Sequence, residues 1–303
     1  MKYFYYILIT LFLCNIICIT SCSNDYNNDD SVIITHFADD IVNNQSVAVY
    51  NDYLFLVSIG CKDIVLYDLK IKKILCSIKL KCRTPSIYHC NQATFGVNFY
   101  LVDDYFPLLY ISQRANEVNR CFTEVFRIIP SSDDGLKNIS SIEVEKVQTI
   151  YYPVMSNENS MGNVNTVIDQ ETRLIYTYSR NNNMEDDNYG VCKISCFEIP
   201  DVHHKEVYLE DEDMIDSYIL SCSAINMQGG CVKDGNLYVL QGNSSVGMYM
   251  NIINLLSRQL EKRIDLMLYG IYDEPEGCFI YNEKVMFTTI HGSIWSMITN
   301  TSR

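Results

Sequence analysis

Polar side chains recur at one position of a repeated pattern, directly before short apolar runs, and these residues are the most suited to chemistry. They are amides, one imidazole and carboxylates, namely Gln45, His89, Asn91, Gln92, Asn165, Gln228, Glu274 and Glu276. Aromatic residues fall between the repeats, namely Tyr105, Phe106, Tyr151, Tyr152, Tyr269 and Tyr272. A concave surface with a few convergent polar groups is a common form of binding site. Amides and tyrosines together suit a glycan or a peptide as the ligand.

The same polar residues allow two other interpretations. They could bond to one another and to water and so plug the space between them, because buried amides need partners. Alternatively, Glu276 and a second acid, Asp169, could form the carboxylate pair of a glycoside hydrolase. The sequence contains no GxSxG, HExxH or P-loop motif. We therefore favour ligand binding over catalysis.

An internal repeat positions these residues. Three segments align without a gap: QSVAVYNDYLFLV from Gln45, QGGCVKDGNLYVL from Gln228 and EGCFIYNEKVMFT from Glu276. A fourth copy, NTVIDQETRLIYT, begins at Asn165. The first three copies predict a strand, a two-residue turn and a second strand, with turns at Asn51-Asp52, Asp234-Gly235 and Asn282-Glu283.

Further strands follow most copies, so four short antiparallel strands recur about every 45 to 65 residues. This repeat without helical periodicity is typical of propeller blades. We predict an all-β fold, a five-bladed β-propeller, in preference to a β-sandwich, which would not explain a gapless repeat. The predicted blades are 45–88, 89–152, 163–209, 226–267 and 274–303, with KEVYLE (205–210) as the fourth strand of the third.

The last blade has only three predicted strands before Arg303. The segment VIITHF, residues 32–37, precedes the first blade and has no other predicted partner. We expect this N-terminal strand to supply the missing outer strand of the last blade, because the shared blade closes the ring and removes two free sheet edges. The propeller domain is therefore predicted to span 32–303.

The first 21 residues predict a lipoprotein signal peptide, with Lys2 followed by an apolar run. The run is too short to be a convincing transmembrane helix, and its end, Ile19-Thr20-Ser21-Cys22, resembles the bacterial lipobox. Cys22 is then the lipidated residue, and the acidic segment 22–31 is expected to be a flexible tether. The protein is thus expected to be exported and lipid-anchored in the cell envelope, at the outer membrane and exposed at the cell surface. There it is expected to bind its ligand, or to scaffold an envelope complex, through the polar residues of the repeat.

The net charge and the positions of histidine and cysteine limit which partners and metal sites the sequence predicts. A formal net charge of −14 opposes nucleic-acid binding, which depends on Lys and Arg. Five scattered histidines and the absence of CxxC predict no metal site, and no cofactor is expected. Several cysteines lie in apolar strand-like runs and are predicted to be unpaired core thiols, namely Cys76, Cys121, Cys192, Cys231 and Cys278.

The segments HCNQATFG, FPLLYISQ, QGGCVKDGNLYVL and EPEGCFIYN carry a resemblance to a known group. Over residues 32–303 the chain resembles the five-bladed β-propeller lipoproteins of Bacteroidota. The resemblance implies the fold and a location in the cell envelope, and it implies no particular chemistry.

The lipid anchor gives a first prediction. Cys22→Ala should leave unprocessed precursor and abolish incorporation of labelled fatty acid, because the acylated side chain is lost. Cys18→Ala, a change inside the predicted signal peptide, should still label. Unchanged labelling of Cys22→Ala would contradict the assignment.

Overall fold

The computed structural model describes residues 32–39, 41–80, 90–113, 121–130, 141–153, 164–180 and 190–299. The predicted signal peptide, the tether, Cys22 and His89 lie outside these residues. Residues Ile34–Ile298 form one compact unit, to which nearly all described residues belong.

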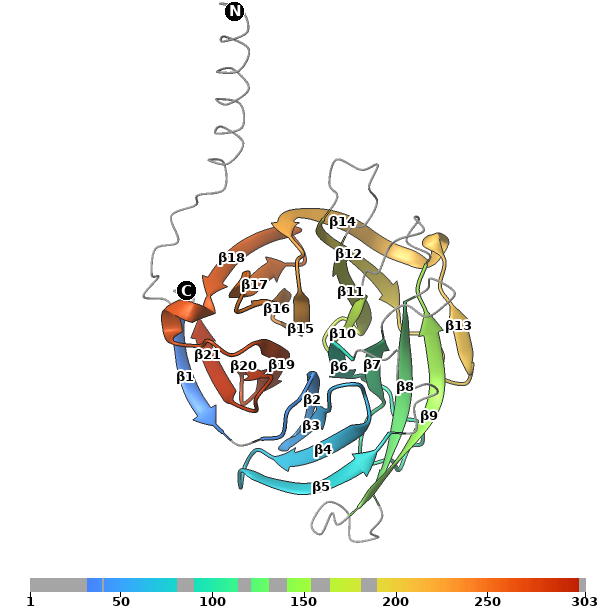
Figure 1. Cartoon of the computed structure of the whole chain (residues 1–303). Helices are drawn as coiled ribbons and strands as arrows, with labels where there is room; N and C mark the ends of the chain where they lie inside the picture. The colour runs from blue at the N-terminus through green and yellow to red at the C-terminus, as the bar shows by residue number, and fades with distance from the viewer. Residues whose placement is uncertain are drawn as a thin grey trace, which may run out of the picture. The chain divides into compact units, whose positions relative to one another are not determined.

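Five sheets of antiparallel strands surround one axis (Figure 1), which confirms the predicted all-β propeller. Blade one consists of β2 (Ser46–Tyr50), β3 (Tyr53–Val57), β4 (Asp63–Asp68) and β5 (Lys73–Lys79). Blade two consists of β6 (Gln92–Phe95), β7 (Leu109–Gln113), β8 (Phe122–Pro130) and β9 (Ile142–Tyr151), and blade three of β10 (Asn165–Asp169), β11 (Leu174–Arg180), β12 (Val191–Glu198) and β14 (Met214–Ser223). Blade four consists of β15 (Met227–Lys233), β16 (Asn236–Asn243), β17 (Gly247–Asn254) and β18 (Gln259–Asp265). Blade five consists of β19 (Pro275–Tyr281), β20 (Lys284–Thr289), β21 (Ile294–Thr299) and β1 (Val32–Ala38).

The turns between the first two strands of a blade lie where the repeat predicts them. Tyr50 pairs with Tyr53, Lys233 with Asn236, and Tyr281 with Lys284, so each of these turns has two residues. Asp234 and Gly235 both have positive φ, 51° and 71°, as a type I′ turn requires. This turn matches the right-handed twist of the strands it joins, so the local sequence specifies these hairpins.

The outer edges of blades two and three differ from the prediction. KEVYLE forms β13 (Glu206–Tyr208), which pairs in parallel with β9 of blade two. The fourth strand of blade three is instead β14, which begins after a short 3₁₀ helix, η3 (Asp211–Asp213). The stacked rings of Tyr151 and Tyr208, 4.6 Å apart, fix β13 on β9. A three-residue strand carries too little pattern to show which neighbouring edge it covers.

The N-terminal strand closes blade five as predicted, because β1 is hydrogen-bonded to β21. Phe37 packs edge-on against Tyr281 and lies under the ammonium group of Lys72. Beyond the strand, the side chain of Asn44 donates to the carbonyl of Thr289 over 3.1 Å. These contacts join both ends of the propeller sequence in one blade.

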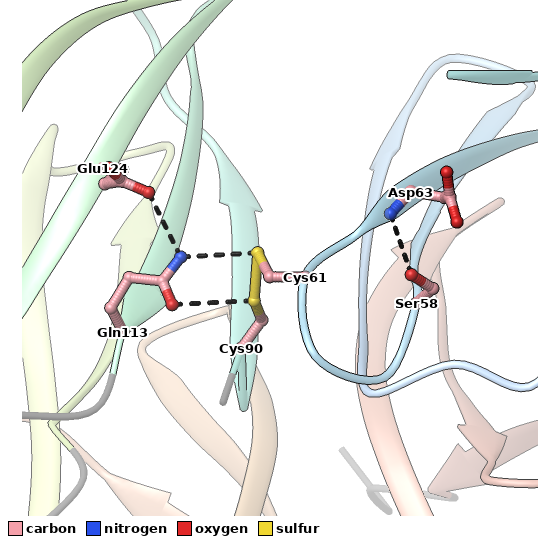
Figure 2. The surroundings of a disulfide bond; sticks show 6 residues. All are labelled: Ser58, Cys61, Asp63, Cys90, Gln113 and Glu124. Atoms are coloured by element: carbon pink, nitrogen blue, oxygen red, sulfur yellow. Dashed lines mark hydrogen bonds between the residues drawn. A yellow bond between two sulfur atoms is a disulfide. The ribbon is translucent and has the colours of Figure 1, made fainter. Parts of the chain in front are cut away.

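A disulfide between Cys61 and Cys90 links blade one to the segment leading into blade two. Figure 2 shows Gln113 beside the two sulfur atoms, with its amide 3.4 Å from a carboxylate oxygen of Glu124. Both cysteines are buried among the apolar residues packed between these blades. The five cysteines predicted to be core thiols are free in the structure.

The closing strand gives a second prediction. A chain beginning at residue 38 loses β1, so the outer edge of β21 is unpaired and free to join other molecules. It should melt at a lower temperature and aggregate, as measured by thermal unfolding and light scattering. A chain beginning at residue 32 is the matched control and should remain soluble. Equal melting temperatures for the two chains would contradict closure by β1.

Candidate functional site

The predicted polar residues lie at the beginnings of the innermost strands, β2, β6, β10, β15 and β19 (Figure 1). Most are buried side chains, with exposures of 6% or less for Gln45, Asn91, Gln92, Asn165, Gln228 and Glu276, whereas Glu274 is half-buried. His89 lies outside the described residues. We call Gln45, Gln92, Asn165, Gln228, Glu274 and Glu276 the polar ring.

Hydrogen bonds within the polar ring join different blades. Gln45 Nε2 donates to Glu276 Oε2 over 2.8 Å, which connects blades one and five. Gln228 Nε2 donates to Glu274 Oε1 over 2.8 Å, which connects blade four to the segment before β19. These four side chains therefore have partners before any ligand arrives.

Gln92 spans the axis. Its Oε1 accepts from the backbone N–H of Gly230 over 2.7 Å, and its Nε2 donates to the carbonyl of Gly230 over 2.9 Å. The amide thus pairs with backbone as a neighbouring strand would, between blades two and four. The hydroxyl of Tyr178 donates to the carbonyl of Gln228, two residues before Gly230, over 2.7 Å. Gln92 acts here as a structural plug, which is one of the two non-catalytic interpretations of the sequence.

Two side chains of the polar ring have atoms that could still form hydrogen bonds. Neither the Nδ2 nor the Oδ1 atom of Asn165 has a hydrogen-bond partner in the part of the chain that the structure describes. The same holds for Oε1 of Gln228. Buried polar groups rarely remain unsatisfied, because their desolvation is costly. These atoms are suited to a bound water or to a polar ligand atom.

The acidic side of the polar ring is electrostatically strained. Burial, followed by the nearby charges of Glu274 and Asp273, raises the pKa of Glu276 to about 9. Burial also raises the pKa of Glu274, although the bond from Gln228 opposes this effect. Burial acts in the same direction on Asp273, but hydrogen bonds from Thr289 and His291 outweigh it and lower its pKa. Glu276 is therefore a neutral acid at neutral pH.

The second acid of the hydrolase alternative lies elsewhere. Asp169 ends β10, whereas Glu276 lies at the beginning of β19. A five-residue strand spans roughly 13 Å at 3.3 Å per residue, and hydrolase carboxylates are separated by about 5 to 9.5 Å. Asp169 accepts instead from Thr172 and from the backbone of Glu171 in its own turn. This placement gives the hydrolase pair no support.

A cavity of about 760 Å³ occupies the axis at the opposite end of the innermost strands, and we call it the axial cavity. Ala48, Ala93 and Gly230 lie on its inner wall. Its lining also includes residues of the inner hairpin turns and their neighbours, namely Tyr50, Asn51, Asp52, Tyr53, Gln170, Tyr281, Asn282 and Glu283. Asn51, Gln170, Asn282 and Glu283 are exposed, so the cavity is open on the turn side.

The repeat predicts a pocket at the polar ring, whereas the axial cavity at the opposite end was not predicted. A signal was present, because polar turn residues and adjacent tyrosines recur in the first and fifth copies of the repeat. The loop aromatics singled out from the sequence serve other purposes: Phe106 and Tyr152 are buried in the core, at 1% and 2% exposure. Tyr105 and Tyr272 are exposed and do not line the axial cavity.

No protein-family model matches this chain, and no curated protein matches it. Among solved structures, the chain is similar to glutaminyl cyclase from Myxococcus xanthus, with 10% identity, a TM-score of 0.47, and coverage of 88% of this chain and 96% of that one. It is also similar to PQQ-bound aldose sugar dehydrogenase from Streptomyces coelicolor, with 12% identity, a TM-score of 0.46, and coverage of 86% and 79%. At such identities the similarity concerns the propeller fold alone.

No helix among the described residues is long and apolar enough to cross a membrane. Within the same ranges, no three His, Cys, Asp or Glu side chains are grouped so that they could hold a metal ion.

Glu276 gives a third prediction. Because its pKa is about 9 in the folded protein and near 4.5 in the unfolded chain, its contribution to stability is fully present below about pH 4.5 and is lost as the pH rises to 9. Glu276→Gln keeps the acceptor for Gln45 and removes the ionisation. Its melting temperature should exceed the wild-type value by several degrees near pH 9, and the difference should vanish below about pH 4.5. The matched change Glu212→Gln, at an exposed position, should not alter the profile, and parallel profiles for all three proteins would contradict the pKa shift.

Proposed function

We propose that this protein is a lipid-anchored propeller of the cell envelope that binds a neutral glycan in the axial cavity. Cys22 attaches it to the outer membrane through lipid, and residues 22–31 hold the propeller away from the bilayer, with the site exposed at the cell surface. The propeller itself is non-catalytic in this proposal. Its membrane partner is the bilayer, and its ligand comes from outside the cell.

The composition of the axial cavity carries the proposal. Its volume, about 760 Å³, falls within the roughly 300 to 1,000 Å³ that small-ligand sites occupy. Three tyrosines are among its lining residues, namely Tyr50, Tyr53 and Tyr281. Flat rings with polar edges suit the apolar faces and the hydroxyl groups of a sugar.

The charges at the rim favour an uncharged ligand over an anionic one. Asp52 and Glu283 both line the axial cavity. The nearby ammonium group of Lys233 is held by Glu283 over 2.9 Å and by Asp234 over 2.8 Å, so it does not offer a free positive charge. Exposed amides of Asn51, Gln170 and Asn282 supply both donors and acceptors. A peptide ligand would have to be neutral or basic, because an acidic peptide would be repelled by the carboxylates at the rim.

The binding site gives a fourth prediction. A glycan array with the 32–303 fragment should identify a neutral oligosaccharide, whose affinity is then measured by calorimetry. Thr94→Trp should lower this affinity at least about tenfold, because Thr94 is a half-buried residue of the cavity wall and the larger side chain fills the space. Ile219→Trp, at an exposed position on the outermost strand of blade three, is the matched control.

Gln228→Ala separates the axial cavity from the polar ring as the binding site. With the glycan in the axial cavity, this change should lower the melting temperature and leave the affinity unaltered. Loss of affinity in Gln228→Ala with normal affinity in Thr94→Trp would move the ligand to the polar ring. A glycan array that yields no ligand would overturn the glycan proposal.

A further inference from the structure

Two cysteines from neighbouring blades meet on the wall of the axial cavity. Cys231 lies next to the central residue of β15, and Cys278 is the central residue of β19. Their sulfur atoms lie 3.0 Å apart. This separation is short for two sulfur atoms that share no bond, and Cys231 and Cys278 are 47 residues apart in the sequence. The tertiary structure therefore creates a dithiol that the sequence does not show.

The two cysteines differ in exposure. Both residues line the axial cavity. Cys231 is half-buried, whereas Cys278 is only 2% exposed. A small molecule in the cavity would therefore meet Cys231 first, with Cys278 directly behind it.

Two other cysteine pairs in the described residues provide internal comparisons. The sulfur atoms of Cys61 and Cys90 are bonded to each other, buried, and covered by Gln113 (Figure 2). Cys192 and Cys222 are hydrogen-bonded thiols of blade three, at 0% and 7% exposure. Neither pair lines the axial cavity. Only the pair Cys231 and Cys278 thus combines proximity with an open approach among the described pairs.

We infer that Cys231 and Cys278 form a site of thiol–disulfide exchange, which takes small neutral disulfides in the axial cavity and closes reversibly to an inter-blade disulfide. The Cys231 thiolate attacks one sulfur of the small disulfide and releases the other half as a thiolate. The Cys278 thiolate then attacks the Cys231 sulfur of this mixed disulfide and releases the second half. The two protein thiols are oxidised, the small disulfide is reduced, and the two protons pass to the released thiolates.

The geometry of the fold makes this closure compatible with the native structure. The bond would join the middles of two innermost strands that already lie side by side, because Gly229 leaves room for the backbone of Glu276 and Gly277. A cross-link over 47 residues removes conformational freedom from the unfolded chain. The oxidised protein should therefore melt at a higher temperature than the reduced protein. This inference does not depend on whether the cavity binds a glycan.

The test uses the purified full-length protein with hydroxyethyl disulfide, a small neutral probe. Burial raises the pKa of the Cys231 thiol well above its ordinary value, so the exchange is run near pH 9, where more thiolate is present. Peptide mapping by mass spectrometry then measures each cysteine pair before and after addition of 2-mercaptoethanol.

We expect a Cys231–Cys278 cross-link that forms with the probe and opens again with 2-mercaptoethanol. The Cys61–Cys90 link should persist in the same reduced samples, and Cys192 and Cys222 should remain thiols throughout. In Cys278→Ser, the mixed disulfide should accumulate on Cys231, because no second thiol resolves it. In Cys231→Ser, the buried Cys278 should stay unmodified, and the rise in melting temperature on oxidation should be absent.

Three results would overturn the inference. The first is that Cys231 and Cys278 remain thiols in the native protein while the urea-unfolded chain reacts with the same probe. The second is a Cys231–Cys278 bond that resists 2-mercaptoethanol as fully as the Cys61–Cys90 bond does. The third is a mixed disulfide that persists on Cys231 in the wild-type protein, which would show that Cys278 does not act as its partner.

Discussion

The close approach of five backbones around one axis is the constraint on which the structure depends. Side chains at the axis compete for this space, so the innermost strands need small residues where they meet. A Cβ atom on Gly229 would lie 2.5 Å from the carbonyl oxygen of Glu276, and one on Gly277 would lie 2.5 Å from a methyl carbon of Val47. These two glycines therefore leave room for neighbouring blades.

The same crowding determines what happens to polar groups near the axis. An amide there loses water, and a hydrogen bond to another blade offsets this cost. Gln92 bonds to the backbone of Gly230, and Gln45 bonds to Glu276. The burial of Glu276 among other acids has an electrostatic cost, which the neutral form of the carboxyl reduces. The polar ring thus stabilises the arrangement of blades at one end of the axis.

The other end of the axis is less crowded and open to solvent. There the innermost strands end in hairpin turns, and the turns from blades one, three and five carry polar side chains that reach solvent. The axial cavity lies among these turns, with tyrosine rings near the rim and a dithiol on its wall. The same repeat therefore has two outcomes. At one end of the innermost strands the side chains of the polar ring bond to one another and to backbone, and at the other end the turn residues line an open cavity.

Much of this architecture followed from sequence alone, because it rests on local rules. Alternating apolar residues and the Asp234-Gly235 type of turn specify hairpins, and a gapless repeat specifies blades. The missing strand of the last blade predicted the pairing of β1 with β21. The edge covered by β13 did not follow, because a three-residue strand has no pattern that distinguishes one blade from the next.

The site was predicted less well, for a physical reason. The repeat register brought Gln45, Gln228 and Glu276 to one end of the axis, and the structure places them there. Whether such groups bond to each other or face open space depends on interatomic distances between blades, which no single repeat encodes. The same is true of the thiols of Cys231 and Cys278. The sequence by itself determined the blades and their order, and only the tertiary structure decided where their side chains meet, because packing between distant segments fixes the distances across the axis.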